Sequence, residues 1–130
     1  MRKPFVHVTI TKEVSGYSAF TTVGQDFIGT EGESYEELKT NILEAINLAF
    51  EERSIIYTIE DIRFTLDLPS FFEFYKIINA KALSQQIGMN QSLLAQYITG
   101  KKRPSPMQIR RILKGVQQIG KELSEIQFLM

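Results

Sequence analysis

The sequence contains no cysteine and only one histidine, His7, among its 130 residues. Without cysteine the chain forms no disulfide, thiolate metal site or cysteine nucleophile. A lone histidine has no second imidazole or thiolate with which to build a metal centre or a catalytic triad, so we interpret His7 as structural. These absences argue against the metal-dependent and thiol classes of enzyme.

Long apolar runs are also missing. None approaches the ~20 residues that span a bilayer, and the N-terminus lacks the apolar segment of a signal peptide. No low-complexity tract is present, and a hydrophobic fraction of 43% is enough for packed cores. We expect a soluble, cytoplasmic protein with no membrane partner.

Acidic residues and glycines lack the spacings of known catalytic sites. Carboxylates that could in principle hold a metal are scattered along the first half, at Glu13, Asp26, Glu44, Asp61 and Asp67. The glycines of this half precede no Lys-Ser/Thr pair of the kind that completes a phosphate-binding loop. We therefore predict no catalytic residue, no metal site and no cofactor, and we expect that the protein is not an enzyme.

The formal net charge of zero hides a division between the two halves of the chain. Residues 1–68 carry six Lys/Arg against twelve Asp/Glu, whereas residues 69–130 carry nine against three, giving −6 and +6. A basic half favours contact with phosphate, and an acidic half repels nucleic acid and attracts basic proteins. The alternative is that the two halves only attract each other.

Alternation of apolar and polar residues predicts strands in the first half. They are expected over residues 5–11, 17–22, 27–30 and 63–68, the last with Phe64, Leu66 and Leu68 inward. A Ser34–Glu37 capping box predicts a helix that runs to about Arg53. We predict that residues 1–68 form a β-β-β-α-β domain, an antiparallel sheet with a helix on one face.

The second half, residues 69–130, is predicted to be all-α. A Ser70–Glu73 capping box begins a short helix, and Ser105 with Pro106 begins the last one. Between them, Asn79 and Asn90 are expected to cap two short helices that end at Gly88 and Gly100.

These two short helices are followed directly by a basic run, the order of parts in a helix-turn-helix reader of the DNA major groove. Gln91 and Ser92 stand at the N-terminal end of the second helix, where side chains reach base edges. The basic residues after it would contact phosphate. The alternative is a plain helical bundle with a solvated polar face.

The last helix has apolar residues at spacings of three and four, which is typical of a helix-packing seam. Ile109 and Ile112 are expected to close the helix-turn-helix core. We predict that the later members mediate dimerisation: Val116, Ile119, Leu123 and Ile126. Gly115 and Gly120 would permit the approach of another helix. The alternative is that this segment packs on the chain's own first domain.

Two family resemblances follow. The segment ALSQQIGMNQSLLAQYITGKKRPSPMQIRRI resembles the Cro/C1 (Xre-type) helix-turn-helix of phage and bacterial repressors over about residues 71–120. By that resemblance the base contacts come from Gln91, Ser92 and Gln96. The expected phosphate contacts are Asn90, Lys101, Lys102 and Arg103.

The first half, with its β-β-β-α-β order and the segment GESYEELKTNILEAI, is similar to the HicB antitoxin fold, a degenerate RNase H-like domain. The resemblance implies that this domain binds and blocks a HicA-like toxin, a small basic mRNA-cleaving protein. A C-terminal DNA-binding domain then represses the operon.

The expected function is therefore that of an antitoxin in a type II toxin–antitoxin pair. It would bind double-stranded operator DNA as a homodimer or higher homo-oligomer. The alternative is a stand-alone ligand-responsive transcriptional repressor, which a concave apolar pocket with a few polar groups in residues 1–68 would favour. An interaction scaffold that has lost DNA binding and an active nuclease are further alternatives.

Overall fold

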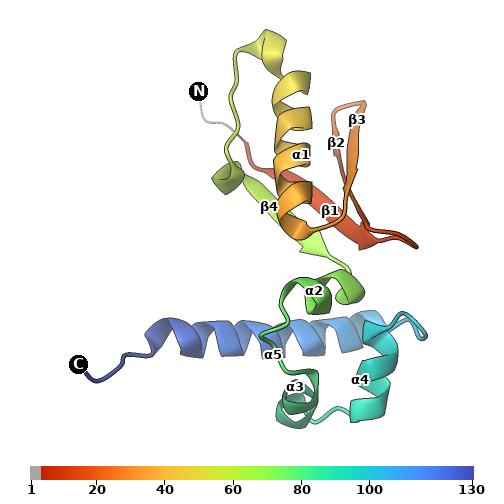
Figure 1. Ribbon diagram of the computed structural model, residues 1–130, viewed down its shortest axis with the longest axis vertical. Helices are drawn as coiled ribbons and strands as arrows, with labels where there is room; N and C mark the ends of the chain where they lie inside the picture. The colour runs from red at the N-terminus through yellow and green to blue at the C-terminus, as the bar shows by residue number, and fades with distance from the viewer. Residues whose placement is uncertain (1–3) are drawn as a thin grey trace. The chain divides into compact units, whose positions relative to one another are not determined.

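The computed structural model describes residues 4–130 and divides the chain into two units, residues 1–74 and 75–130. Within the described residues, a four-stranded sheet precedes most of the five α-helices, so the expected α+β class is confirmed (Figure 1). Helix α2 (Leu68–Phe74) belongs to the first unit, although its sequence pattern led us to place it in the C-terminal domain.

The division at residue 74 increases the difference in net charge between the two parts of the chain. Glu73 lies in α2 and therefore counts with the first unit. Residues 1–74 then carry six basic against thirteen acidic side chains, and residues 75–130 carry nine against two. The resulting net charges are −7 and +7.

The sheet has the strand order β3-β2-β1-β4. β1 (Val6–Lys12), β2 (Tyr17–Val23) and β3 (Asp26–Gly32) pair antiparallel, but β4 (Ile62–Leu66) runs parallel to β1, with Val8 opposite Phe64. The prediction of an antiparallel sheet is therefore wrong for this pair, and the sheet is mixed. The reason is topological: α1 (Tyr35–Ala49) carries the chain back along the sheet, so β4 starts at the same end as β1.

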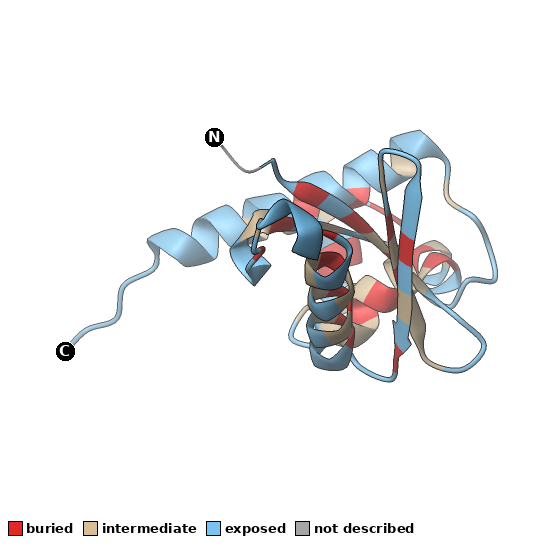
Figure 2. Cartoon of the chain, turned by 90° about the horizontal axis from the view of Figure 1, so that it is seen from above, coloured by how far each residue is buried: buried red, intermediate tan, exposed pale blue. Residues whose placement is uncertain are grey.

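The core of the first unit lies between the sheet and one face of α1. Val8 and Ile10 on β1 and the α1 stripe of Leu38, Ile42 and Ile46 are fully buried, and these residues appear in red in Figure 2. Ala49, at the end of the helix, is exposed. Further buried members close the two ends of this layer: Val6, Ala19, Ile28, Phe50, Tyr57 and Ile62.

The start of α1 is capped by Ser34, whose Oγ accepts from the backbone N–H of Glu37 at 3.1 Å. The Glu37 carboxylate accepts from the N–H of Glu33 at 3.4 Å, one residue earlier than an ideal capping box requires. The helix ends at Ala49, and a 3₁₀ turn, η1 (Glu51–Arg53), follows where the sequence predicted a continuous helix.

Helix α2 starts differently from the prediction. Asp67 accepts from the N–H of Ser70 at 3.0 Å, so Asp67 rather than Ser70 is the cap, and the predicted Ser70–Glu73 box is wrong. The Glu73 carboxylate instead accepts from Lys12 Nζ at 2.8 Å and from the hydroxyl of Tyr17 at 2.7 Å. A charged carboxylate makes a stronger helix cap here than a serine hydroxyl would. Its second oxygen also accepts from the backbone N–H of Lys12 at 2.9 Å.

The same end of the sheet holds an aromatic cluster. The ring of Phe74 lies 4.6 Å from that of Tyr17 and 4.7 Å from that of Tyr35, measured between centroids. Burial, and then the hydrogen bond and negative charge of Glu73, raise the pKa of Tyr17 to about 12. These contacts attach α2 to the sheet.

The second unit contains α3 (Ala80–Ile87), α4 (Gln91–Ile98) and α5 (Pro106–Glu125), close to the predicted helices. The predicted caps are confirmed: Asn79, Asn90 and Ser105 each accept from backbone N–H groups of the first helical turn. Ile112 is buried as expected, but Ile109 is 43% exposed, so its predicted place in the core is wrong. The buried apolar residues of this unit are Leu83, Met89, Leu94, Tyr97 and Ile112.

Candidate nucleic-acid interface and N-terminal pocket

The turn between α3 and α4 is tightly organised. Gly88 has φ = 68°, a left-handed conformation that glycine adopts without steric cost. Its N–H donates to Gln85 O at 3.3 Å, and the N–H of Met89 donates to Ser84 O at 2.8 Å. This paired arrangement satisfies the last carbonyls of α3 and directs the chain into α4.

Arg111, on α5, forms hydrogen bonds to the turn between α3 and α4. Its Nε donates to Ile87 O at 3.1 Å, and one of its terminal nitrogens donates to Gly88 O at 2.6 Å. The side chain therefore supplies a positive charge to the C-terminal end of α3, where the helix dipole favours one. The role of Arg111 could not be predicted from the sequence, because its partners are more than twenty residues away and no local sequence pattern indicates such a contact.

One face of α4 is polar and open to solvent. Gln91, Ser92, Ala95 and Gln96 are exposed, whereas Leu94 and Tyr97 are buried against the unit's core. Residues four apart lie next to each other on a helix, so Ser92 adjoins Gln96 and Gln91 adjoins Ala95, and the predicted base-contacting side chains Gln91, Ser92 and Gln96 all lie on the exposed side of α4. We call this set the α4 polar face.

Asn90 stands at the start of α4. Its Oδ1 accepts from the N–H groups of Ser92 and Leu93 at 2.8 and 3.2 Å. The oxygen is thus engaged in capping, while the amide nitrogen makes no hydrogen bond within residues 4–130. That nitrogen and the remaining free N–H at the helix start are donors of the kind that contact phosphate.

The predicted phosphate-contacting run, Lys101 to Arg103, follows a left-handed Gly100 with φ = 78°. All three side chains are exposed, and none forms an ion pair with another described residue. The N–H of Lys102 donates to Gln96 O at 3.2 Å, which holds this basic loop beside the C-terminal end of α4. The structure therefore brings the α4 polar face and the basic loop together in one unit.

The predicted dimerisation residues lie along the second half of α5. Val116 and Ile119 are half-buried, Leu123 is 58% exposed, and Ile126 is 53% exposed just beyond the helix end. The last turns of α5, nearest the C-terminus in Figure 2, are pale blue because they are exposed. Of the two glycines, Gly115 packs directly on α3, and Gly120 faces open space.

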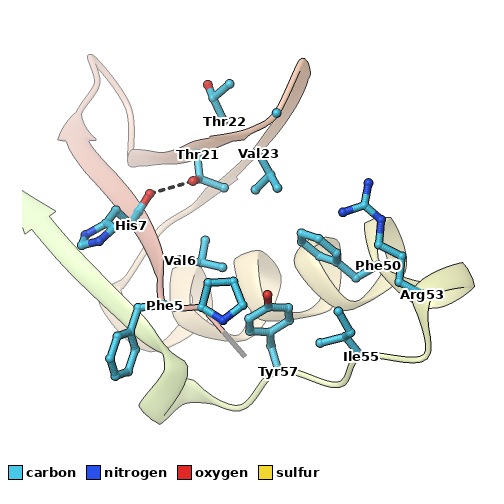
Figure 3. Close-up of a pocket in the computed structure, with 12 residues that line it drawn as sticks. Phe5, Val6, His7, Thr21, Thr22, Val23, Phe50, Arg53, Ile55 and Tyr57 are labelled. Carbon is cyan, nitrogen blue, oxygen red and sulfur yellow. Dashed lines mark hydrogen bonds between the residues drawn. The ribbon is translucent and has the colours of Figure 1, made fainter. Parts of the chain in front are cut away.

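The first unit contains a pocket of about 380 Å³ beside the start of β1, the end of β2 and the chain that follows α1 (Figure 3). Within the described residues, no group of three His, Cys, Asp or Glu lies close enough to hold a metal ion. The His7 imidazole is exposed, and the backbone carbonyl of His7 accepts from the hydroxyl of Thr21 at 2.7 Å.

None of the described helices has the length and apolar character needed to cross a membrane. Comparisons of the chain with protein-family models, curated proteins and solved structures find no match. The function must therefore be argued from geometry and charge, together with the sequence resemblances.

Proposed function

We propose that this protein is an antitoxin that also represses its own operon, with its second unit as the DNA-binding part. The observation that carries the proposal is the α4 polar face beside a basic loop whose cations have no partner among the described residues. Amide side chains at the start of a helix read base edges, and unpaired cations next to it neutralise phosphate. A net charge of +7 on this unit, from nine basic against two acidic side chains, supports the same reading.

The proposed complex has α4 in the major groove of duplex DNA, with the basic loop on the flanking backbone. Base contacts come from Gln91, Ser92 and Gln96, and phosphate contacts from Asn90 and the loop. Two copies, associated through the second half of α5, would bind the two half-sites of a palindromic operator.

The toxin-binding role of the first unit is supported by its resemblance to the HicB fold and by its net charge of −7, from six basic against thirteen acidic side chains. A surface of this sign attracts a small basic protein and speeds its association. The proposed partner is a HicA-like ribonuclease, which the antitoxin blocks by covering it.

DNA binding is tested with the full chain and a duplex that it selects from a random pool. Changing Gln91 and Gln96 together to alanine should reduce the preference for the selected duplex over random duplex by ~1–3 kcal/mol per lost bidentate contact. Gln117→Ala, on the exposed side of α5, is the matched control and should leave the preference unchanged. An unaltered preference in the double variant would exclude α4 as the reading helix.

Phosphate contact is tested separately. Changing Lys101 and Lys102 together to alanine should weaken selected and random duplexes alike and lower the salt dependence by nearly one unit of slope per lost contact. Lys121→Ala removes one charge near the far end of α5 and is the control. If only the selected duplex were affected, these lysines would be reading bases instead.

Toxin binding is tested by affinity capture with the full chain, followed by an activity assay on the captured protein. The proposal expects a small basic protein whose RNA cleavage stops when the chain is added in equal amount. A captured ribonuclease that stays active, or the absence of any ribonuclease, would refute the antitoxin role and leave the DNA-binding assignment standing.

A second candidate function is a repressor that responds to a small molecule. The pocket in the first unit favours it, because it is concave, combines apolar with polar lining residues and lies within the size range of small-molecule sites. Release of the selected duplex on addition of a pocket ligand would distinguish this candidate from the antitoxin.

A further inference from the structure

The pocket of the first unit has an apolar floor. Val6, Phe50 and Tyr57 are at most 5% exposed, and the rings of Phe50 and Tyr57 lie 5.2 Å apart between centroids at an angle of 50°. Figure 3 shows Val23 directed into the same space from β2. The two rings are in contact with each other, so an apolar group would lie over this pair rather than between its members.

The buried hydroxyl in this region is already satisfied. Thr21 is 5% exposed and donates to His7 O at 2.7 Å, so it does not require a ligand hydroxyl or water. The imidazole of His7 points away from the pocket in Figure 3. Neither the Thr21 hydroxyl nor the His7 imidazole is therefore positioned to bind a ligand in this pocket (Figure 3).

Arg53 places a cation at the edge of this pocket. The guanidinium of Arg53 lies 5.2 Å from the centroid of the Phe50 ring. It is exposed and forms no side-chain hydrogen bond or ion pair with another residue of 4–130. The ring contact holds the positive charge over one wall while its donors remain available.

The charge of this lining contrasts with the rest of the unit. Residues 1–74 carry thirteen carboxylates, yet among residues 4–74 no Asp or Glu lines the pocket, and Arg53 is the one Lys or Arg that does. Glu51 and Glu52 precede Arg53 in η1 but do not line the pocket, and more distant charges are screened over about 8 Å at physiological ionic strength, so the cation that lines the pocket decides the local preference. That preference is for an anion.

We propose that this pocket binds a small organic carboxylate with an apolar body of one ring or one branched chain. The body lies against Val23 and over the pair of Phe50 and Tyr57, and the carboxylate pairs with Arg53. A guanidinium is suited to this because its parallel donors match the two oxygens of a carboxylate. A volume of about 380 Å³ is at the low end for ligand pockets and fits a single ring. This site requires neither DNA nor a toxin and goes beyond the antitoxin role.

The test is a backbone-amide NMR titration of the full chain with phenylacetate and, in parallel, with neutral phenylacetamide. Phenylacetate should shift the amide signals of Val6, Val23 and Tyr57 together. Its affinity should exceed that of the amide by about tenfold, as expected for one charge-assisted pair.

Arg53→Gln should weaken phenylacetate binding by about tenfold and leave the weak binding of phenylacetamide unchanged. Lys39→Gln is the matched control, because it removes one positive charge from the same unit. The Lys39 ammonium pairs with Glu36 at 2.8 Å, and neither residue lines the pocket, so this variant should bind as the parent does.

Three results would overturn the proposal: equal binding of acid and amide, equal losses in the Arg53→Gln and Lys39→Gln variants, or no shifts at about 10 mM, where even a millimolar ligand fills most sites. Binding of the selected duplex by Arg53→Gln is measured alongside. Failure of the pocket proposal with intact DNA binding leaves the proposed function untouched.

Discussion

Gly115 and Gly120, both in α5, have opposite surroundings. A Cβ on Gly115 would clash with Cγ2 of Ile87, whereas one on Gly120 would meet nothing within 4 Å. Ile87 is β-branched and stiff at χ1, so its methyl group cannot move aside cheaply. Gly115 therefore allows α5 to pack closely against α3.

We predict that Gly115→Ala lowers the free energy of unfolding by ~1–3 kcal/mol, the usual cost of overpacking, despite alanine's better helix propensity. Gly120→Ala should raise it by up to ~1 kcal/mol, since only the propensity changes. Urea denaturation followed by circular dichroism measures both. Shifts of the same sign in the two variants would contradict the close packing of α5 on α3.

Tyr17 should make stability depend on pH in the alkaline range. Its pKa is raised from 10.0 to about 12, first by burial and then by the hydrogen bond and charge of Glu73. Between about pH 10 and pH 12 the unfolded chain loses the phenol proton while the folded chain keeps it, so stability falls as pH rises. Below about pH 10 this contribution is fully present.

Tyr17→Phe lacks this ionisation and is the control. The stability difference between parent and variant should therefore shrink from about pH 9 to about pH 11 in urea denaturation. In an alkaline absorbance titration, the variant should also have one tyrosine fewer that ionises above the usual tyrosine pKa. A constant stability difference would show that the Tyr17 hydroxyl is not held in the environment described.

At the scale of secondary-structure elements, local patterns predicted most helices and strands but not their partners. Alternation identified β1 and β4, yet it is the same for parallel and antiparallel pairing, so the direction of β4 was missed. Ser70 matched a capping box, but Asp67 is the cap because it also binds the backbone of β1, a contact distant in sequence.

The features of the candidate interface also fall into those that the local sequence predicts and those that depend on distant contacts. Exposure of the α4 polar face followed from helical spacing and from the Asn90 cap, both local properties. Arg111 could not be predicted, because its role depends on how α5 crosses the end of α3. The pocket was not predicted either, since β1, β2 and the chain after α1 contribute its walls from separate parts of the sequence.

Arg111→Gln should loosen the turn between α3 and α4. It removes two hydrogen bonds to carbonyls at the end of α3. Because the position is exposed, we expect the free energy of unfolding to fall by about 1 kcal/mol. Hydrogen exchange at the amides of Gly88 and Met89 should accelerate accordingly. Arg110→Gln is the control: its side chain is exposed and makes no hydrogen bond within residues 4–130, so exchange there should stay as in the parent.

At the scale of the whole molecule, the dimer that we propose rests on the exposed apolar residues at the end of α5 and just beyond it. Leu123 is 58% and Ile126 53% exposed, and both continue the three–four spacing of Val116 and Ile119. A strip of this spacing can pack against a second helix, and in our proposal a two-fold pair would give the two DNA-binding units the symmetry of a palindrome.

We predict that the parent chain sediments as a dimer at micromolar concentration and that Leu123→Glu converts it to a monomer. The new charge lies at an exposed position, so folding of the single chain should be unaffected, but charges facing each other across a two-fold interface repel. Gln117→Glu adds the same charge on the opposite side of α5 and should remain dimeric. A parent that sediments as a monomer, or a Leu123→Glu variant that stays dimeric, would remove this strip from the interface. Because two linked half-sites bind far more tightly than one, Leu123→Glu should also weaken binding to a palindromic duplex more than to a single half-site.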